Sequence, residues 1–335
     1  MAILYITEQG ATVRHLGGRI SVRRDERILQ ELPDFKLDQL VVFGNVNLTP
    51  GLISYCFERG LDVAFLSSTG KYRGRLQPEL AKNVALRRKQ FEREADAEFR
   101  RATAATIVAA KCRNMIAMAR SQRRLRDEGR SPIAEIEAIL PRIASARAVD
   151  SLYGFEGAAT AAYFRAFRAA LKGDWQFDAR EYHPPRDEVN ALLSLGYSLL
   201  YNDFYAAINI VGLDPYLGVF HRPRHGHACL ASDLMEELRA AVVDRLVLTA
   251  LNKRSLVKKD FTVNADGHLR LATEALKSFL GLYAAQLNES VHYASQNIRT
   301  TYRQVIEYQA RQFARYVMGE ETAYKPFLIA ETAAE

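Results

Sequence analysis

The chain has 335 residues, of which 48% are hydrophobic and 25% charged, and its formal net charge is +7. This composition supplies enough apolar side chains for a sizeable core, which excludes a disordered or fibrous protein, and the length favours two domains. Three widely separated cysteines, an N-terminus without a signal-peptide pattern and the lack of any apolar run of about 18–20 residues predict a cytoplasmic protein without a membrane span.

Residues 1–78 have the pattern of a small β-rich domain. Short runs of alternating apolar and polar residues, separated by glycine-containing turns, are typical of strands. The predicted strands cover 4–6, 12–16, 19–23, 27–32, 40–43, 61–66 and 71–76. One short helix interrupts them, because Thr49 and Pro50 form a helix start and Gly60 a helix end.

From residue 79 onward the apolar residues recur at the spacing of amphipathic helices. The predicted helices lie near 79–104, 104–126, 133–147, 155–172, 187–211, 232–255, 271–289 and 297–318. The expected fold class is therefore α+β, with a β-rich N-terminal domain at 1–78 and an all-α domain at 79–335. The long connection at 214–229 is a candidate functional loop, since long ordered loops often carry function.

The stretch 71–130 carries much of the positive charge, with 17 Lys and Arg against 7 Asp and Glu. A basic stretch on an otherwise near-neutral chain is typical of a protein that binds a polyanion such as nucleic acid. The alternative is a solvated helix face, because Glu92, Glu94, Asp96 and Glu98 lie at helical spacing from neighbouring bases. Charge alone leaves both interpretations open.

The first candidate site is Gly154-Phe155-Glu156-Gly157, which places one carboxylate between two glycines at the predicted start of an alanine-rich helix. Small neighbours allow a ligand or another backbone to approach closely. However, a glutamate in a first helical turn is also stabilised by the helix dipole and needs no ligand. The segment by itself does not decide between a functional and a structural glutamate.

The second candidate site is the loop 221–229, where His221, His225, His227 and Cys229 offer four soft metal ligands within nine residues. Zinc is one interpretation, although structural zinc sites usually draw their ligands from two separated pairs. Arg222 and Arg224 lie beside the histidines, which also suits a loop that faces phosphate or a hard metal ion. A plain polar loop is the third interpretation.

The third candidate site combines Asp233 and Glu236. If Asp233 caps a helix, Glu236 completes a capping box and both acids are structural. The same spacing puts them about one turn apart, where they can share a metal ion, with Arg239 one turn further on to meet a phosphate. Carboxylates with an imidazole nitrogen suit Mg²⁺ or Mn²⁺, which activate a hydroxyl for phosphodiester chemistry. Spacing does not show that the three candidate sites converge.

Taken together, these motifs resemble those of the CRISPR-associated endonuclease/integrase family. Members of this family are the larger of the two core proteins of spacer acquisition. The resemblance runs along nearly the whole chain, and the order and spacing of its motifs make it specific. The motifs are 42–49 (VFGNVNLT), 63–74 (VAFLSSTGKYRG), 83–90 (NVALRRKQ), 154–157 (GFEG), 212–218 (GLDPYLG), His221 and 230–237 (LASDLMEE).

The resemblance implies that Glu156, His221 and Glu236 bind one Mg²⁺ or Mn²⁺ ion, with Asp233 as an accessory catalytic acid. His225 and His227 have no counterpart in the family pattern. It also implies a homodimer formed through the N-terminal domains and a small ferredoxin-like partner protein. The implied reaction joins the 3′-hydroxyl of a foreign DNA fragment to a repeat of the CRISPR array, and water in place of that hydroxyl gives endonuclease activity.

Basic side chains are expected to hold the backbone of double-stranded DNA without reading its sequence. The candidates are Arg73, Arg75, Lys82, Arg87, Arg88, Arg222, Arg224 and Arg239. Two other function classes remain open. One is a non-catalytic nucleic-acid scaffold in which the acids cap helices, and the other is a zinc-dependent hydrolase built on the His/Cys loop 221–229.

Overall fold

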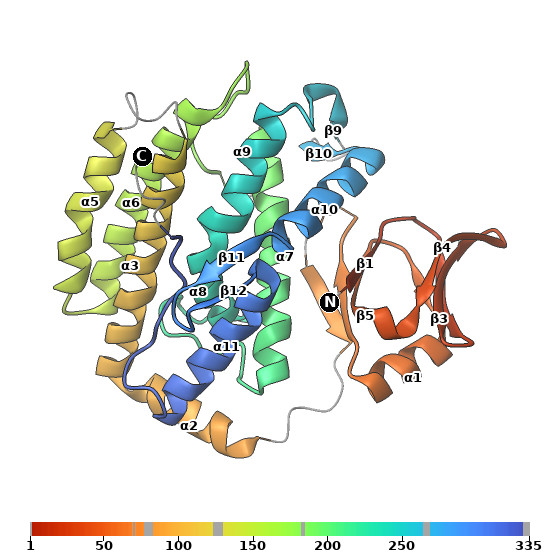
Figure 1. The fold of residues 1–335 in the computed structure, drawn as a ribbon, viewed down its shortest axis with the longest axis horizontal. Coiled ribbons are helices and arrows are strands. Elements are labelled where there is room, and N and C mark those ends of the chain that lie inside the picture. Colours follow the sequence, from red (N-terminus) through yellow and green to blue (C-terminus); the bar gives the residue numbers. More distant parts are fainter. Residues whose placement is uncertain are drawn as a thin grey trace. The chain divides into compact units, whose positions relative to one another are not determined.

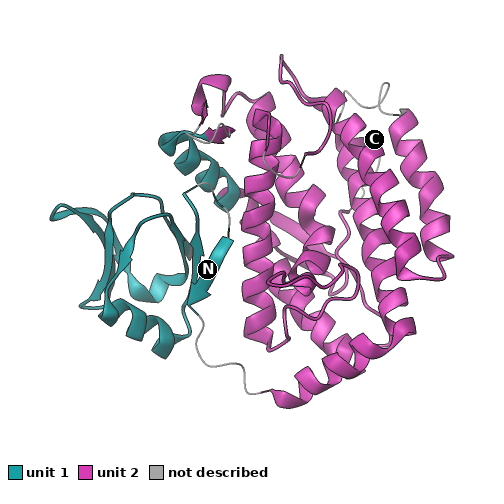
Figure 2. Ribbon diagram, turned by 180° about the vertical axis from the view of Figure 1, so that it is seen from behind, with its two compact units in different colours: residues 1–80, 271–284 teal, residues 81–270, 285–335 magenta. Residues whose placement is uncertain are grey.

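The computed structural model describes residues 2–330 except 69, 71, 77–82, 123–129, 182–184 and 264–268. The chain is α+β and divides into two compact units (Figures 1 and 2). Unit 1 comprises 1–80 and 271–284, and unit 2 comprises 81–270 and 285–335. Unit 2 differs from the predicted domain 79–335, since 271–284 groups with unit 1. The predicted boundary between residues 78 and 79 lies outside the described residues.

Unit 1 contains two four-stranded sheets, and the seven predicted strands are confirmed among them. The first sheet has the order β1-β5-β7-β8, in which β1, β5 and β7 run parallel and β8 is antiparallel to β7. The second has the order β4-β3-β2-β6. The bounds are β1 Ala2–Ile6, β2 Thr12–Leu16, β3 Arg19–Arg24, β4 Arg27–Pro33, β5 Leu37–Phe43, β6 Asn47–Leu48, β7 Asp62–Leu66 and β8 Tyr72–Leu76.

The core of unit 1 forms where the apolar positions of the alternating strands meet α1 (Pro50–Arg59). Val13, Ile20, Leu40 and Val63 are fully buried there together with Leu52 of the helix. The predicted helix signals are also confirmed. The Thr49 hydroxyl accepts from the backbone N–H of Leu52 at 3.4 Å, Pro50 occupies the first turn, and Gly60 ends the helix with φ 64°.

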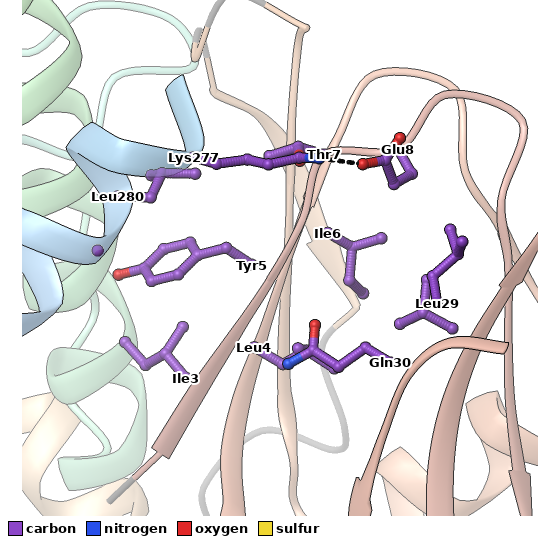
Figure 3. A pocket seen from close by; sticks show the side chains of 12 residues that line it. Ile3, Leu4, Tyr5, Ile6, Thr7, Glu8, Leu29, Gln30, Lys277 and Leu280 are labelled. Carbon is purple, nitrogen blue, oxygen red and sulfur yellow. Dashed lines mark ion pairs between the residues drawn. The ribbon is translucent and has the colours of Figure 1, made fainter. Parts of the chain in front are cut away.

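A pocket of about 380 Å³ lies within unit 1 between β1, β4 and the helix α10 (Thr273–Leu287) (Figure 3). Apolar side chains including Ile3, Leu29 and Leu280 line it, and Lys277 of α10 forms an ion pair with Glu8. No residue of the predicted candidate sites lines this pocket.

Unit 2 is mainly helical, and the contacts of one helix organise it. That helix is α3, which contacts α5, α6 and α8, while α8 also contacts α7 (Figure 1). The bounds are α2 Val84–Ala95, α3 Ala97–Ser121, α5 Arg130–Ala144, α6 Val149–Ala170, α7 Glu188–Val211, α8 Cys229–Leu238, α9 Arg245–Asn252 and α11 Tyr302–Met318. A π-helical segment, Arg239–Asp244, joins α8 to α9.

The expectation of an all-α second domain is wrong, because four short strands interrupt the helices. β9 (Phe261–Val263) pairs with β10 (Leu269–Leu271), and β11 (Ser290–Tyr293) pairs antiparallel with β12 (Ile298–Thr301). The alternating run at 298–301 contains three β-branched residues, which favour a strand. The predicted helix 297–318 therefore starts at Tyr302, after a capping box of Thr301 and Gln304.

The two helices that carry the predicted site glutamates start earlier than the sequence pattern indicated. The helix that carries Glu156 begins at Val149 rather than near 155, and the helix that carries Glu236 begins at Cys229 rather than 232. Short 3₁₀ turns occur at Asp34–Lys36 and Lys258–Asp260. Within the described residues, no helix combines the length and apolar character needed to cross a membrane.

Candidate functional site

The three predicted metal-binding side chains come together in unit 2 around a lysine that the sequence analysis did not single out. Lys111 of α3 donates a hydrogen bond from Nζ to Oε1 of Glu156 on α6. The same Nζ lies 2.7 Å from Oε2 of Glu236 on α8. Nε2 of His221, in the loop before α8, lies 3.7 Å from Oε1 of Glu236. The candidate sites at 154–157, 221 and 233–236 are therefore one site.

Helix packing places Lys111 in this position. Because α3 contacts both α6 and α8, a side chain on its inner face reaches both. Ile107, Lys111 and Met115 recur every four residues along α3, and all three are buried. A lysine at a position where the helical pattern otherwise has apolar residues indicates a buried charge, so the sequence did contain a signal for Lys111. That signal was missed because Lys111 was counted as one of many basic residues in 71–130.

Asp233 fixes the orientation of His221. Its carboxylate is fully buried and accepts hydrogen bonds from three consecutive backbone N–H groups, those of Val219 (2.6 Å), Phe220 (3.1 Å) and His221 (2.8 Å). Nδ1 of His221 lies 2.7 Å from Oδ1 of Asp233. A carboxylate accepts hydrogen bonds, so Nδ1 is the nitrogen placed to donate to Asp233, and in the neutral form of the ring Nε2 has the free lone pair. That lone pair belongs to the nitrogen nearer Glu236.

The structure excludes the helix-capping and first-turn interpretations of the acids. Ala228 is the N-cap of α8 and makes no side-chain capping bond, so Asp233 and Glu236 lie in the helix interior and form no capping box. Glu156 is the eighth residue of α6, beyond the first turn where a helix dipole stabilises a carboxylate. Each acid instead pairs with a side chain from another part of the fold, or with the loop.

The electrostatics of the site favour the ionised forms of its two glutamates. Burial raises the pKa of Glu236 and of Glu156, but nearby cations outweigh burial and lower both below the usual value. Lys111 acts on both glutamates, and Nη2 of Arg239 lies 3.0 Å from Oε1 of Glu236. Burial opposes the charge on Lys111 as well, yet Glu236 and Glu156 raise its pKa. The site is a compensated cluster of buried charges.

The donor set fits a hard divalent cation. Two carboxylates and one oriented imidazole provide oxygen and nitrogen ligands of the kind that Mg²⁺ and Mn²⁺ accept. Oε2 of Glu236 is buried and accepts no hydrogen bond, because Nζ of Lys111 is near it but outside hydrogen-bond geometry. In the arrangement shown, no three His, Cys, Asp or Glu side chains of the described residues are grouped closely enough to hold an ion, and Lys111 lies between the two glutamates.

The His/Cys loop does not form a zinc site in this arrangement. His225 is exposed, and Nε2 of His227 lies 3.1 Å from the Ser232 hydroxyl. Cys229 is buried, with its thiol 3.5 Å from the backbone carbonyl of Arg222. Burial raises the pKa of that thiol, which disfavours the thiolate that zinc binds. His221 is the one member of the loop that faces the glutamates.

The predicted DNA-contacting residues have different environments. Arg73, Arg88, Arg222 and Arg224 are exposed, Arg87 is half-buried, and Arg239 belongs to the charge cluster. Arg222 forms an ion pair with Asp150 at 2.8 Å and stacks on the Tyr153 ring. Arg75 forms an ion pair with Asp62 and its side chain is only 6% exposed, so we leave it out of the proposed contacts. Lys82 lies outside the described residues.

Gly218 permits the close contact between the loop and Asp233. A Cβ atom at this position would lie 2.6 Å from Oδ2 of Asp233 and 2.7 Å from Cβ of Cys229. Gly218→Ala is therefore expected to lower the free energy of unfolding by about 1–3 kcal/mol and to reduce the melting temperature. Gly154→Ala is the control, since its Cβ would meet nothing within 4 Å and alanine favours the helix. Equal melting temperatures for Gly218→Ala and the unchanged protein would contradict this account.

Comparisons with known proteins identify relatives along the whole chain. The family model "CRISPR associated protein Cas1" matches residues 4–285. A Thermus thermophilus protein named CRISPR-associated endonuclease Cas1 3 is 34% identical over 98% of both chains. A Methanospirillum hungatei protein named CRISPR-associated endonuclease Cas1 4 is 33% identical over 98% of this chain and 91% of its own.

Solved structures agree with this result. A Cas1 protein from Thermotoga maritima has a TM-score of 0.83 and 25% identity, and the match covers 97% of this chain and 99% of that one. A casposase bound to integration product has a TM-score of 0.84 over 99% of this chain and 94% of that one, at 24% identity, which shows a shared fold.

Proposed function

This chain belongs to the Cas1 family of CRISPR-associated endonucleases, and we propose that it inserts foreign DNA fragments into a CRISPR array by metal-dependent transesterification. The observation that carries the proposal is the convergence of Glu156, Glu236 and His221 in unit 2, with Asp233 fixing the imidazole. The proposed ion is Mg²⁺ or Mn²⁺, held by the two carboxylates and by Nε2 of His221.

In the proposed mechanism each side chain has a separate task. Glu156, His221 and Glu236 bind the ion, which when bound supplies Lewis-acid chemistry to the nucleophile and to the phosphate oxygens. Asp233 keeps the hydrogen on Nδ1 of His221, so that Nε2 stays available as a ligand. Arg239, whose side chain is 18% exposed beside Glu236, is placed to hold a phosphate through its guanidinium group.

The chemistry exchanges one phosphodiester bond for another. The 3′-hydroxyl of the incoming fragment loses its proton and its oxygen bonds to a phosphorus atom of the target strand. The bond from that phosphorus to the neighbouring 3′ oxygen breaks, and the released oxygen takes up a proton. Water in place of the 3′-hydroxyl gives cleavage, which is the activity named for the curated relatives.

The proposed function is tested by an integration assay with a short duplex, a repeat-containing target and Mn²⁺ or Mg²⁺. Joined product should form with a 3′-hydroxyl duplex and disappear with a 3′-deoxy duplex, while cleavage of the target by water persists. The assay is run with and without a small ferredoxin-like partner protein. If neither joining nor cleavage occurs with Mn²⁺ or Mg²⁺ present, the result favours a non-catalytic nucleic-acid scaffold.

Backbone contacts to double-stranded DNA are proposed for exposed arginines of the basic stretch. Arg73→Ala and Arg88→Ala are expected to weaken binding of every duplex alike, and each lost phosphate contact should reduce the salt slope by about 0.9. The measurement is affinity against salt concentration for two unrelated duplexes. Arg165→Ala is the control, because this exposed arginine lies outside the stretch and pairs with Glu135. Loss of preference for one duplex at an unchanged slope would contradict the proposal.

We also propose that unit 1 mediates formation of a homodimer. Unit 1 exposes several large apolar side chains on or beside its second sheet, and such exposed side chains often mark protein interfaces. Leu16 and Phe35 are 72% and 71% exposed, and Ile28 and Leu29 are 50% and 46% exposed. These side chains support unit 1 as the dimerisation domain.

A further inference from the structure

Lys111 is a buried cation at the place where the proposed metal ion needs its oxygen ligands. Its side chain is 6% exposed, and its Nζ contacts one oxygen of Glu156 and one of Glu236. The two carboxylates offset the loss of hydration that burial imposes on the ammonium group. A divalent ion needs the same oxygen atoms and repels the ammonium group at short range. Binding of the ion therefore requires Lys111 to move.

A small cavity of about 10 Å³ lies beside Lys111, enough for about one water molecule. Thr160, Arg180, Tyr197, Arg239 and Asp244 are among the side chains that line it with Lys111. The guanidinium groups of both arginines lie over the Tyr197 ring, at 5.4 Å and 4.7 Å from its centre.

Asp244, at the end of the π-helical segment, provides a second carboxylate for Lys111. It is fully buried and accepts hydrogen bonds from the hydroxyls of Tyr163 (2.9 Å) and Tyr197 (2.5 Å). Burial raises the pKa of Asp244 to about 6, while Arg239 and Lys111, which line the same cavity, favour its charged form. Lys111 and Asp244 line the same cavity, so a movement of the ammonium group toward this carboxylate would keep it inside the protein.

We propose that Lys111 is a resident counter-ion with two positions. Without metal it holds Glu156 and Glu236 together, and when a divalent ion binds it moves into the adjacent cavity and pairs with Asp244. The inference rests on the proposed metal site and adds a positioning role for Lys111 and Asp244, neither of which is a metal ligand. It follows that the free energy needed to displace Lys111 lowers the affinity for the ion. Asp244 raises that affinity, because it stabilises the displaced lysine.

The test measures Mn²⁺ affinity by calorimetry and the melting temperature with and without Mn²⁺. Lys111→Met should bind Mn²⁺ about tenfold more tightly, as expected if the lysine leaves the site open about one tenth of the time. Its metal-free melting temperature should fall, and Mn²⁺ should raise it more than in the unchanged protein. Lys258→Met is the matched control, because Lys258 pairs with Asp174 at the surface.

Asp244→Asn tests the second position and keeps the pairs of Lys111 with the glutamates. This variant should bind Mn²⁺ several-fold more weakly, because the displaced ammonium group has no carboxylate to meet. In the double variant Lys111→Met/Asp244→Asn the effect of Asp244 should disappear, so that its affinity matches Lys111→Met within about twofold. Because Asp244→Asn retains the lysine, unchanged Mn²⁺ affinity in this variant refutes the second position even if Lys111→Met fails to fold without metal.

The outcomes separate this inference from the proposed function. If the unchanged protein binds Mn²⁺ through Glu156, but Lys111→Met binds no more tightly or Asp244→Asn binds no more weakly, the two-position lysine is wrong and the proposed function stands. If the unchanged protein does not bind Mn²⁺, both are wrong. If Asp244→Asn weakens binding equally with and without Lys111, Asp244 acts independently and the second position is wrong.

Discussion

Glu156→Gln is expected to reduce metal-dependent cleavage and integration by about 10²–10³-fold or more while the protein stays folded. Glutamine keeps the size of the side chain but removes the charge that a divalent ion requires. Lys111 retains its ion pair with Glu236 in this variant, so the buried ammonium group keeps a carboxylate partner. The measurements are the cleavage rate in Mn²⁺ or Mg²⁺ and the melting temperature.

The structure makes Glu156 a better choice for this test than Glu236. Glu236 is 3% exposed and pairs with both Lys111 and Arg239, so its removal leaves two cations short of a partner and lowers stability as well. Glu135→Gln, at an exposed carboxylate on α5 that pairs with Arg165, is the matched control and should keep full activity. A normal cleavage rate in Glu156→Gln would remove Glu156 from the site.

Asp233→Asn is expected to impair both the fold and the site. The carboxylate accepts from three backbone N–H groups and from His221, whereas an amide has one acceptor oxygen and turns its NH₂ group toward these donors. We expect a loss of about 1–3 kcal/mol in the free energy of unfolding. Loss of the histidine's oriented partner should also lower metal affinity or activity by about 10–100-fold.

The test of Asp233 compares the melting temperature, Mn²⁺ affinity and cleavage rate of Asp233→Asn with those of His221→Ala. If Asp233 acts through His221, the double variant Asp233→Asn/His221→Ala should cleave DNA no more slowly than His221→Ala alone. Asp150→Asn is the control, because this exposed carboxylate pairs with Arg222 outside the charge cluster. Full activity and an unchanged melting temperature in Asp233→Asn would show that neither the loop nor the histidine depends on this carboxylate.

Local sequence patterns predicted the elements whose signals are contained in a few neighbouring residues. The strands of unit 1 alternate clearly, and α1 has a threonine cap, a proline and a terminal glycine within twelve residues. The two-residue β6 and the hairpin β11–β12 were missed because such short runs offer too few alternations. In both cases pairing with another segment, rather than local preference, stabilises the strand.

The candidate site also depends on contacts between distant segments, which local sequence patterns do not reveal. Asp233 and Glu236 have the spacing of a capping box as well as that of a shared site, and only the start of α8 at Cys229 decides between them. That start depends on tertiary contacts, among them the hydrogen bond from the backbone N–H of Leu230 to the carbonyl of Pro215. Lys111 is 45 residues from Glu156 in sequence, so only the contact of α3 with α6 and α8 reveals its role.

The most direct test of the central claim is to locate the ion in crystals of the protein soaked with Mn²⁺, from the anomalous scattering of manganese. The account predicts one strong peak in unit 2, about 2.0–2.3 Å from a carboxylate oxygen of Glu156, a carboxylate oxygen of Glu236 and Nε2 of His221. A peak at His225, His227 and Cys229, or a fully soaked crystal with no peak beside Glu156 and Glu236, would contradict it.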